Sequence, residues 1–248
     1  MTFYELMQLA FLIIGIVLFS RALAVRQRSK NKPFNPVVEF TAAGTRNVAA
    51  LLKIADAPDC PVWILERLAK YHNPELQSLV AAHRNSTENI LGFLSADESR
   101  YVRREVARNP NTPAMICCIL ARDAEPIVLT GALANPSFPI DEFAVLANSE
   151  RVEIRASIAD NYRCPPEILI NLAKDKQAYV RAMAAKNANI PLGYLQALSL
   201  DEEYIVRLAV AKNKNCPIRI QERLFNDSNL SVRAAAADAL YGNSLGKV

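Results

Sequence analysis

Five arginines stand at one recurring position of the chain and are the side chains best suited to bind a partner. They are spaced by 26 residues or by twice that number: Arg103, Arg155, Arg181, Arg207 and Arg233. A guanidinium group binds a carboxylate or a phosphate through two parallel hydrogen bonds, so such a column would present a binding ladder. The rival interpretation is that each arginine pairs with an aspartate or a carbonyl of the adjacent segment. Residues repeated at a fixed position usually serve the repeat itself, which favours pairing, and Leu129 interrupts the column.

Three tyrosines lie just before this column: Tyr101, Tyr179 and Tyr204. Tyrosine beside arginine is the combination that interface hot spots prefer, so these residues are candidates for a partner-binding face. Half-buried packing is the alternative interpretation.

The cysteines and histidines do not form a recognisable metal site. Cys60, Cys164 and Cys216 share one position before a proline, where a small turn residue suffices. Cys117 and Cys118 are adjacent, which matches no zinc pattern, and at least one of them is expected to pack inward. The two histidines, His72 and His83, have no ligand partner at suitable spacing. We predict no metal and no cofactor.

Catalytic signatures are absent from the sequence as well. It has no glycine-rich phosphate loop, no HExxH, no GxSxG and no dinucleotide fingerprint, and only 7 glycines in 248 residues. We therefore predict a protein that is not an enzyme.

A repeat of 26 residues must position all these side chains. Its openers are Asp97, Asp123, Ser149, Asp175, Asp201 and Asp227, and the five full units among them continue with a Val or Ile, then Asn, Pro and Leu in register, whereas the two units before Asp97 are more divergent. Self-similarity at this period indicates a solenoid. Seven full units and a partial one fill residues 45–248.

Each unit is predicted to hold two short helices. Apolar residues recur at helical spacing in Glu202–Lys212, and a second helix is expected over Pro217–Phe225. The Asp opener suits the N-cap of the first helix, the Asn suits a left-handed residue at its end, and the Pro suits the first turn of the second helix. Such short helices are stable only when they pack on neighbouring units.

The repeat resembles the leucine-rich repeat variant family. The motif VRxxxAxN, a CP or TP step and a closing LxxLAxD are most complete over Ile154–Asp175, and the resemblance covers about four-fifths of the chain. It implies an all-α, right-handed superhelix in which the second helix of each unit can take a 3₁₀ form. Some family members hold an iron–sulfur cluster near the N-terminus, but no cysteine precedes Cys60. Ser231–Ala236 also resembles a HEAT repeat of the phycobilin-lyase type.

The first 25 residues are predicted to form a transmembrane anchor. Phe3–Val25 contains the unbroken apolar run Leu9–Ser20 and is long enough to cross a bilayer. Five basic residues lie at or beyond its end: Arg21, Arg26, Arg28, Lys30 and Lys32. The positive-inside rule then places the N-terminus outside and the solenoid in the cytoplasm. Residues 26–44 are expected to form a basic juxtamembrane linker.

A cleaved signal peptide is the alternative, because Ala22-Leu23-Ala24 imitates a cleavage site and cleavage after Ala24 would give a secreted or periplasmic protein. The absence of Lys and Arg before the apolar run argues against it, and an odd number of cysteines, 5, suits a reducing compartment.

Charge separates the remaining hypotheses for function. Residues 1–34 hold five basic and one acidic residue and carry the whole net charge of +4, because the remaining 24 basic and 24 acidic residues cancel. A solenoid that wraps nucleic acid usually has a basic excess. We predict a membrane-anchored scaffold or assembly subunit whose partner is another, membrane-associated protein, and neither a nucleic acid nor a small molecule. The alternatives are a nucleic-acid-binding solenoid that uses the arginine column and a HEAT-lyase-like enzyme or chaperone for a prosthetic group.

Overall fold

The computed structural model describes residues 34–43 and 47–242, and within these ranges the chain forms sixteen helices and no strands. Helices of two kinds alternate. The first helix of each repeat belongs to the series α3 (Val48–Ala55), α5 (Pro74–Ala82), α7 (Arg100–Arg108), α9 (Pro126–Ala134), α11 (Val152–Asp160), α13 (Ala178–Lys186), α15 (Tyr204–Lys212) and α17 (Leu230–Tyr241). The second helices are α4 (Val62–Leu68), α6 (Glu88–Leu94), α8 (Ala114–Leu120), α10 (Glu142–Leu146), α12 (Pro166–Leu172), α14 (Leu192–Leu198) and α16 (Ile218–Leu224).

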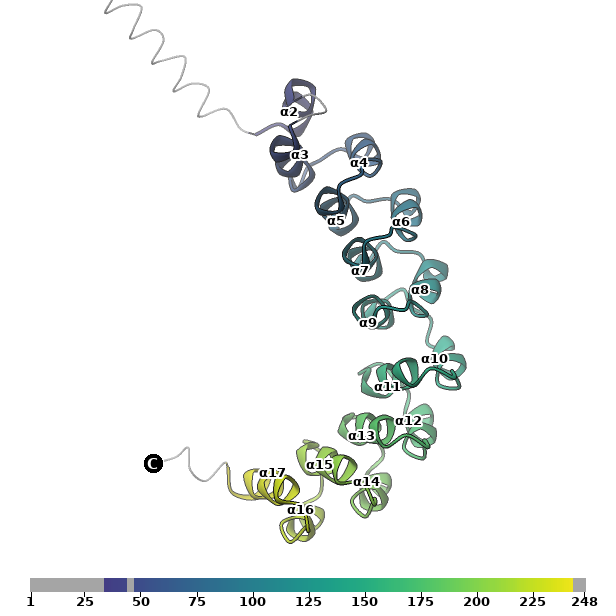
Figure 1. Ribbon diagram of the computed structural model, residues 1–248, viewed down its shortest axis with the longest axis vertical. Coiled ribbons are helices and arrows are strands. Elements are labelled where there is room, and N and C mark those ends of the chain that lie inside the picture. Colours follow the sequence, from purple (N-terminus) through teal and green to yellow (C-terminus); the bar gives the residue numbers. More distant parts are fainter. Residues whose placement is uncertain (1–33, 44–46, 243–248) are drawn as a thin grey trace, which may run out of the picture.

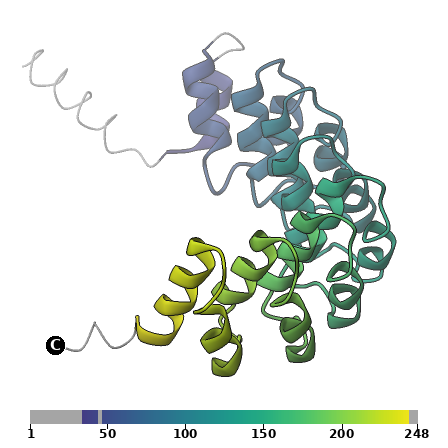
Figure 2. The same cartoon turned by 60° about the horizontal axis from the view of Figure 1, so that its bottom comes forward.

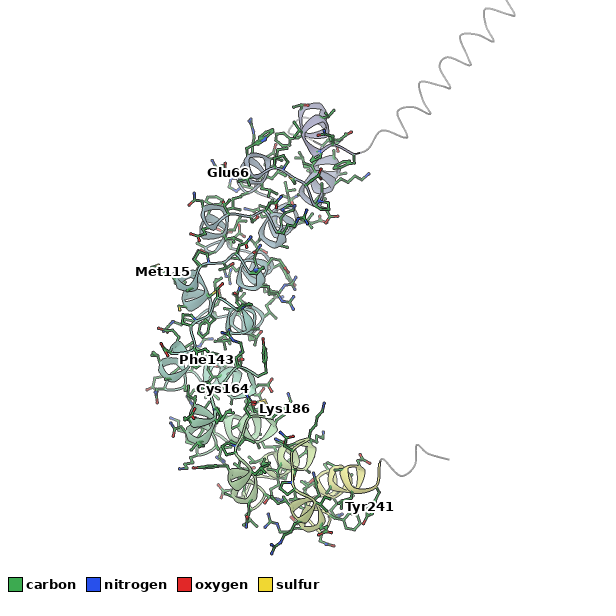
Figure 3. The ribbon with its side chains drawn as sticks, turned by 180° about the vertical axis from the view of Figure 1, so that it is seen from behind. Glu66, Met115, Phe143, Cys164, Lys186 and Tyr241 are labelled. Atoms are coloured by element: carbon green, nitrogen blue, oxygen red, sulfur yellow. The ribbon has the colours of Figure 1, made fainter. Side chains whose placement is uncertain are left out.

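The repeats stack into an arc, so the predicted α-solenoid is confirmed (Figure 1). First helices line the inner, concave side of the arc and second helices its outer, convex side, and a tilted view shows the same two rows (Figure 2). Seen with side chains from behind, Lys186 lies on the inner side, whereas Glu66 and Met115 lie on the outer side (Figure 3). The predicted right-handed sense of the superhelix stays a prediction.

Every repeat contributes the same apolar columns to one continuous core. Val102, Val128, Val180, Val206 and Val232 are fully buried at one repeat position, and the closing leucines Leu68, Leu94 and Leu120 are buried in the same way. Because consecutive first helices pack directly on one another, each unit is covered by its neighbours and not by its own second helix alone.

Three local expectations are wrong in an informative way. The Asp openers are not N-caps, because the helices begin two or more residues later. The recurring Asn of the repeat has extended backbone angles, φ −65° and ψ 131° at Asn187, and not left-handed ones. The second helices are α-helical and not 3₁₀. At the start of α10 the amides of Glu142, Phe143 and Ala144 make three successive i to i−3 hydrogen bonds.

The predicted linker contains a helix, α2 (Pro36–Ala43). The side-chain oxygen of Asn35 accepts hydrogen bonds from the amides of Val37 and Val38 at its start, and Phe40 packs edge-on against Trp63 with ring centroids 5.6 Å apart. Helix α2 therefore covers the first repeat. In residues 34–43 and 47–242 no helix is long and apolar enough to cross a membrane. The predicted anchor Phe3–Val25 and the basic residues from Arg21 to Lys32 lie outside these ranges.

Candidate interaction surface

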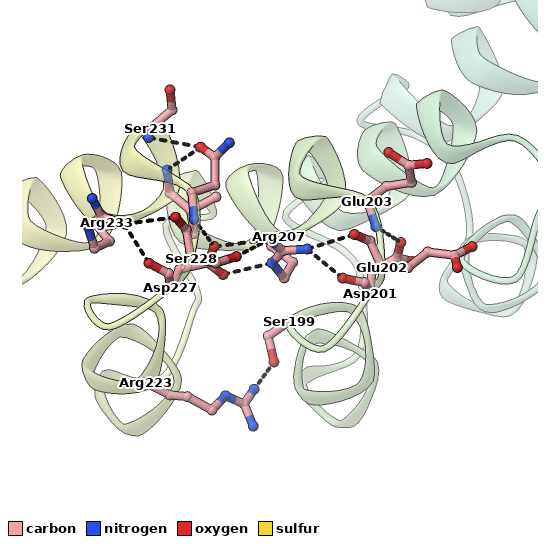
Figure 4. A network of polar contacts seen from close by, with 12 residues as sticks. Ser199, Asp201, Glu202, Glu203, Arg207, Arg223, Asp227, Ser228, Ser231 and Arg233 are labelled. Atoms are coloured by element: carbon pink, nitrogen blue, oxygen red, sulfur yellow. Dashed lines mark hydrogen bonds and ion pairs between the residues drawn. The ribbon is translucent and has the colours of Figure 1, made fainter.

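The arginine column is tied into the framework by what we call the Arg–Asp clamp. The guanidinium group of Arg181 donates from Nε and Nη2 to the carboxylate of Asp201, 20 residues later, at 2.7 and 2.9 Å. Its Nη1 donates to the carbonyls of Asp175 and Lys176 in its own repeat, at 2.9 and 3.3 Å. The pairs Arg103–Asp123, Arg155–Asp175 and Arg207–Asp227 repeat this geometry. Figure 4 shows Arg207 between Asp201 and Asp227.

Each clamped arginine therefore has little capacity left for a partner. A guanidinium group has five N–H donors, and at least four of them are used in each clamp, as at Arg155. Arg233 differs, since within the described ranges it donates only to the carbonyls of Asp227 and Ser228. The pairing interpretation agrees with this geometry, and binding of a partner by the column stays a prediction.

The same aspartates also hold the chain that enters the first helix. Oδ1 of Asp201 accepts a hydrogen bond from the amide of Glu203 at 3.0 Å, which makes a turn two residues before the helix begins. Burial opposes the charge of Asp201, but the hydrogen bonds from Arg181 and Glu203 outweigh burial and lower the pKa of this carboxyl group. The pKa values of Asp123, Asp175 and Asp227 are lowered by the corresponding arginine.

A buried Asn column makes the second connection between repeats. The side-chain amide of Asn187 donates to the carbonyls of Ala159 and Asn161 at 2.7 and 2.8 Å, and its oxygen accepts from the amide of Asn189 at 2.9 Å. His83 occupies this position in an early repeat. Its Nε2 lies 2.9 Å from the carbonyl of Ala57, and its Nδ1 accepts from the amide of Asn85 at 3.0 Å. His83 is thus a structural substitute for asparagine.

The junction between α3 and α5 lacks both halves of the clamp, with Leu51 and Tyr71 at the two positions, and so does the junction between α9 and α11. Leu129 stands where an arginine is expected and Ser149 where its aspartate is expected. Asn161 also makes one interrepeat hydrogen bond, to the carbonyl of Leu133, in place of two. Correspondingly, α9 and α11 pack less extensively than the other neighbouring first helices. We call this the central junction.

Other side chains bridge the central junction. Arg151 donates to the carbonyls of Arg122 and Asp123, and Arg163 donates to that of Phe138 at 3.0 Å. Phe138 and Phe143 are fully buried and pack edge-on, with ring centroids 5.3 Å apart. Their positions hold smaller side chains in the neighbouring repeats, so they add volume to the core at this junction.

The inner side of the central junction is hollowed into a cleft of about 460 Å³, the central cleft. Its lining comes from α9, α11, the loop after α11 and the start of α13, and includes Thr130, Leu133, Ala156, Ser157, Tyr162 and Tyr179. Tyr162 and Tyr179 are 71% and 55% exposed, which is high for large aromatic side chains. Glu153 and Asp160 stand in the same lining, and Asp160 pairs with Lys186 at 2.9 Å.

A second hollow, which we call the arginine groove, lies one repeat earlier between α7 and α9. Its volume is about 610 Å³, and Arg104, Arg108, Ile127 and Thr130 contribute to its lining. Gly131 lies in the same lining, and a Cβ at this position would lie 3.3 Å from Arg108 Cγ. Arg104 donates to Glu105, whereas the guanidinium group of Arg108 has no polar partner among the described residues.

The predicted tyrosines occupy three different surroundings. Tyr101 lies under the guanidinium groups of Arg100 and Arg104, 5.1 and 5.6 Å from its ring centroid, and a hydrogen bond from Arg100 lowers the pKa of its phenol. Tyr179 lines the central cleft. Tyr204 is 45% exposed but lines neither hollow. The structure thus brings the three residues to one row of helices without gathering them into one site.

The outer surface carries an apolar column of its own. Phe93, Ile119 and Val145 share one repeat position on α6, α8 and α10 and are 57%, 60% and 58% exposed, with Met115 beside them. The same position holds Arg67, Asn171 and Arg223 in other repeats.

Burial disfavours the thiolate form of the cysteines. Burial raises the pKa of Cys60, Cys117 and Cys216 to about 11 and that of Cys164 to about 12. Cys117 packs inward, as predicted, and the side chain of Cys118 is partly exposed. Across residues 34–43 and 47–242 no three His, Cys, Asp or Glu side chains are grouped as metal ligands.

Sequence reasoning singled out the repeated arginines and missed Arg104, Arg108 and Tyr162. A framework residue recurs in every unit, whereas a residue that contacts a particular partner is needed only once. Departure from the repeat was therefore the signal to follow, and the break at Leu129 was the visible part of it.

Comparison with known proteins identifies the fold. A solved structure described as a leucine-rich repeat variant with a novel repetitive structural motif superposes with a TM-score of 0.59. The alignment covers 83% of this chain and 82% of that one. The chain has the leucine-rich repeat variant fold. At 22% sequence identity the likeness concerns architecture alone. No protein-family model and no curated protein matches the chain.

Proposed function

We propose that this protein is a non-enzymatic interaction scaffold that binds a segment of another protein along its concave surface. The observation that carries the proposal is the central cleft, where the repeat abandons its clamp and two exposed tyrosines line a hollow of about 460 Å³. Sites where a fold breaks its own rules are often functional. Concave surfaces built by stacked repeats are the surfaces that solenoids use for binding.

The character of the hollow supports a protein partner. Its lining is mainly apolar, with a few hydroxyl groups and carboxylates at its edge, and exposed tyrosines are enriched at protein interfaces. The central cleft also adjoins the arginine groove, since Thr130 and Ala134 of α9 line both. An extended segment can therefore occupy both hollows at once.

Affinity purification with two variants tests the proposal. We expect the double substitution Tyr162→Ala and Tyr179→Ala to remove stoichiometric partner proteins that co-purify with the tagged wild-type protein. The matched change on the outer surface, Phe93→Ala with Ile119→Ala, is expected to leave them bound. The reverse result would move the interface to the outer column. Equal recovery with all three proteins would contradict an interface on either surface.

We also propose that Phe3–Val25 anchors the protein in a membrane, with the solenoid in the cytoplasm. The support is the apolar run and the basic residues that follow it. Resistance of the protein to alkaline extraction from membranes, and a native N-terminus at Met1, are the expected results. A mature chain that begins after Ala24 would establish the signal-peptide alternative.

A further inference from the structure

We infer that the arginine groove recognises a carboxylate side chain of the partner segment, so that the partner is a mixed acidic and apolar stretch and not a polyanion. This inference rests on the proposed function and assigns the chemistry of the segment that lies on the concave surface. It begins from helix α7, which contains four arginines and one glutamate. No other first helix among those described has so large a positive balance.

The geometry of these arginines shows which of them are available. Arg103 is used in a clamp with Asp123, and Arg100 pairs with Glu125 at 3.3 Å. Arg104 places Nε and Nη2 against the carboxylate of Glu105 and lines the groove, and its Nη1 has no hydrogen-bond partner among the described residues. Arg108 is exposed and uncompensated by any described residue. Two guanidinium groups thus border one hollow with donors to spare, an arrangement that suits a carboxylate.

The charged residues that border the two hollows change from arginines on α7 to carboxylates on α11, two repeats later. Glu153 and Asp160 on α11 border the central cleft, and the side chain of Glu153 is 63% exposed, with Arg151 at 4.0 Å as its ion-pair partner. A nucleic-acid strand that followed the concave surface would bring phosphates against these carboxylates. A protein segment avoids this repulsion because it places a negative charge only where the arginines are.

The spacing of the helices gives the expected pattern of the segment. Neighbouring helices lie about 8–10 Å apart, and an extended chain advances about 3.3 Å per residue. One repeat therefore corresponds to about three residues of the bound segment. We expect an Asp or Glu at the arginine groove and an aromatic or aliphatic residue about three positions away in the central cleft. A Lys or Arg next to that apolar residue would face Glu153, which lines the same cleft, and the pattern can run in either chain direction.

Selection from a displayed library of random 12-residue peptides tests this pattern even while the natural partner is unidentified. The targets are the wild-type protein and three variants, all checked by thermal melting. The first, R104E/R108E, reverses the charge of the groove. The second, R67E/R219E, makes the same charge change at exposed arginines of the outer helices α4 and α16. The third, Y162A/Y179A, alters the cleft. Enriched peptides are then synthesised, and their affinities are measured by fluorescence anisotropy beside those of a 20-nucleotide single-stranded DNA.

We expect the wild-type protein to enrich peptides with an acidic residue about three positions from an apolar one. R104E/R108E should weaken binding of these peptides on the order of tenfold or more, and R67E/R219E should not. Enrichment of apolar peptides without an acidic residue, whose binding only Y162A/Y179A weakens, would overturn this inference and leave the proposed function standing. Peptides insensitive to both concave variants would overturn both. DNA binding that depends on Arg104 and Arg108, without acidic peptide enrichment, would overturn the inference and assign the groove to nucleic acid.

Discussion

The clamped arginines show that a residue whose sequence pattern suggests a binding role can use its hydrogen-bond donors within the fold. In the pair Arg181 and Asp201 the side chains are 13% and 10% exposed, and the two side chains share two hydrogen bonds and each makes further ones with the backbone. Removal of one partner leaves a charged group without its counterpart in a largely buried position, which costs more than the pair itself contributes.

We predict that Asp201→Ala lowers the free energy of unfolding by about 2–3 kcal/mol, measured by urea denaturation. The exposed pair Lys186 and Asp160 is the control, with side chains 57% and 47% exposed. There, Lys186→Ala is expected to cost less than about 1 kcal/mol. Equal small effects in the two variants would argue against a structural role for the clamp.

His83 offers a sharper test of the Asn column, because one substitution should preserve the hydrogen bonds that His83 makes there. His83→Asn places in this repeat the residue that other repeats use, and an asparagine there can donate to the preceding repeat and accept from Asn85. We expect a melting temperature close to that of the wild-type protein. His83→Ala removes the hydrogen bond to the carbonyl of Ala57 and leaves the part-buried amide of Asn85 without its acceptor, and should cost about 1–3 kcal/mol. A large loss with asparagine would show that the imidazole ring has a further role.

The central junction shows how whole helices respond to the loss of one clamp. Between α9 and α11 the inner hydrogen bonds are exchanged for Arg151 and Arg163, which bridge loops, and for the buried rings of Phe138 and Phe143. The helices remain joined, but a hollow opens on the concave surface. The site is thus produced by changing the spacing of two helices and not by an insertion, since the 26-residue period continues through it.

Restoring the clamp should close the hollow. We predict that L129R/S149D draws α9 and α11 together, because the new arginine can bridge the carbonyl of Asp123 and the new aspartate. A crystal structure should show a smaller central cleft, and peptides that depend on Tyr162 and Tyr179 should bind more weakly. The variant L129M/S149A, which nearly preserves side-chain volume and adds no clamp, should keep wild-type affinity. An unchanged cleft in the restored variant would show that Phe138 and Phe143 alone set the spacing.

The four clamps together give the molecule a common response to acid. Each aspartate has a pKa below its ordinary value of about 3.9. Stability from a carboxyl group with a lowered pKa is fully present above the unfolded-state value and is lost as the pH falls toward the folded-state value. We therefore expect urea stability to be nearly constant above about pH 5 and to fall steeply below about pH 4. A protein with Arg155, Arg181 and Arg207 replaced by Met should show a weaker fall.

Much of the architecture was predictable from the sequence because each structural position of a repeat occurs several times in the chain. The alternation of helices and their 26-residue spacing are confirmed within the described ranges. The repeat could not show what each polar residue contacts, since an Asp that suits an N-cap is also suited to a turn and to an arginine of the preceding unit. It also hid the hollows, because their residues, such as Arg108 and Tyr162, occur once and do not stand out when the units are compared.

The clamps and the Asn column have a final consequence for how the chain reaches this arrangement. Every interrepeat hydrogen bond described above joins residues only 20 to 29 positions apart, in a chain of 248. Contact order is therefore low despite the length of the molecule, and closing such short loops costs little chain entropy. Folding can start at any neighbouring pair of repeats and spread in both directions. A nascent chain needs little more than two repeats outside the ribosome before native contacts begin to form.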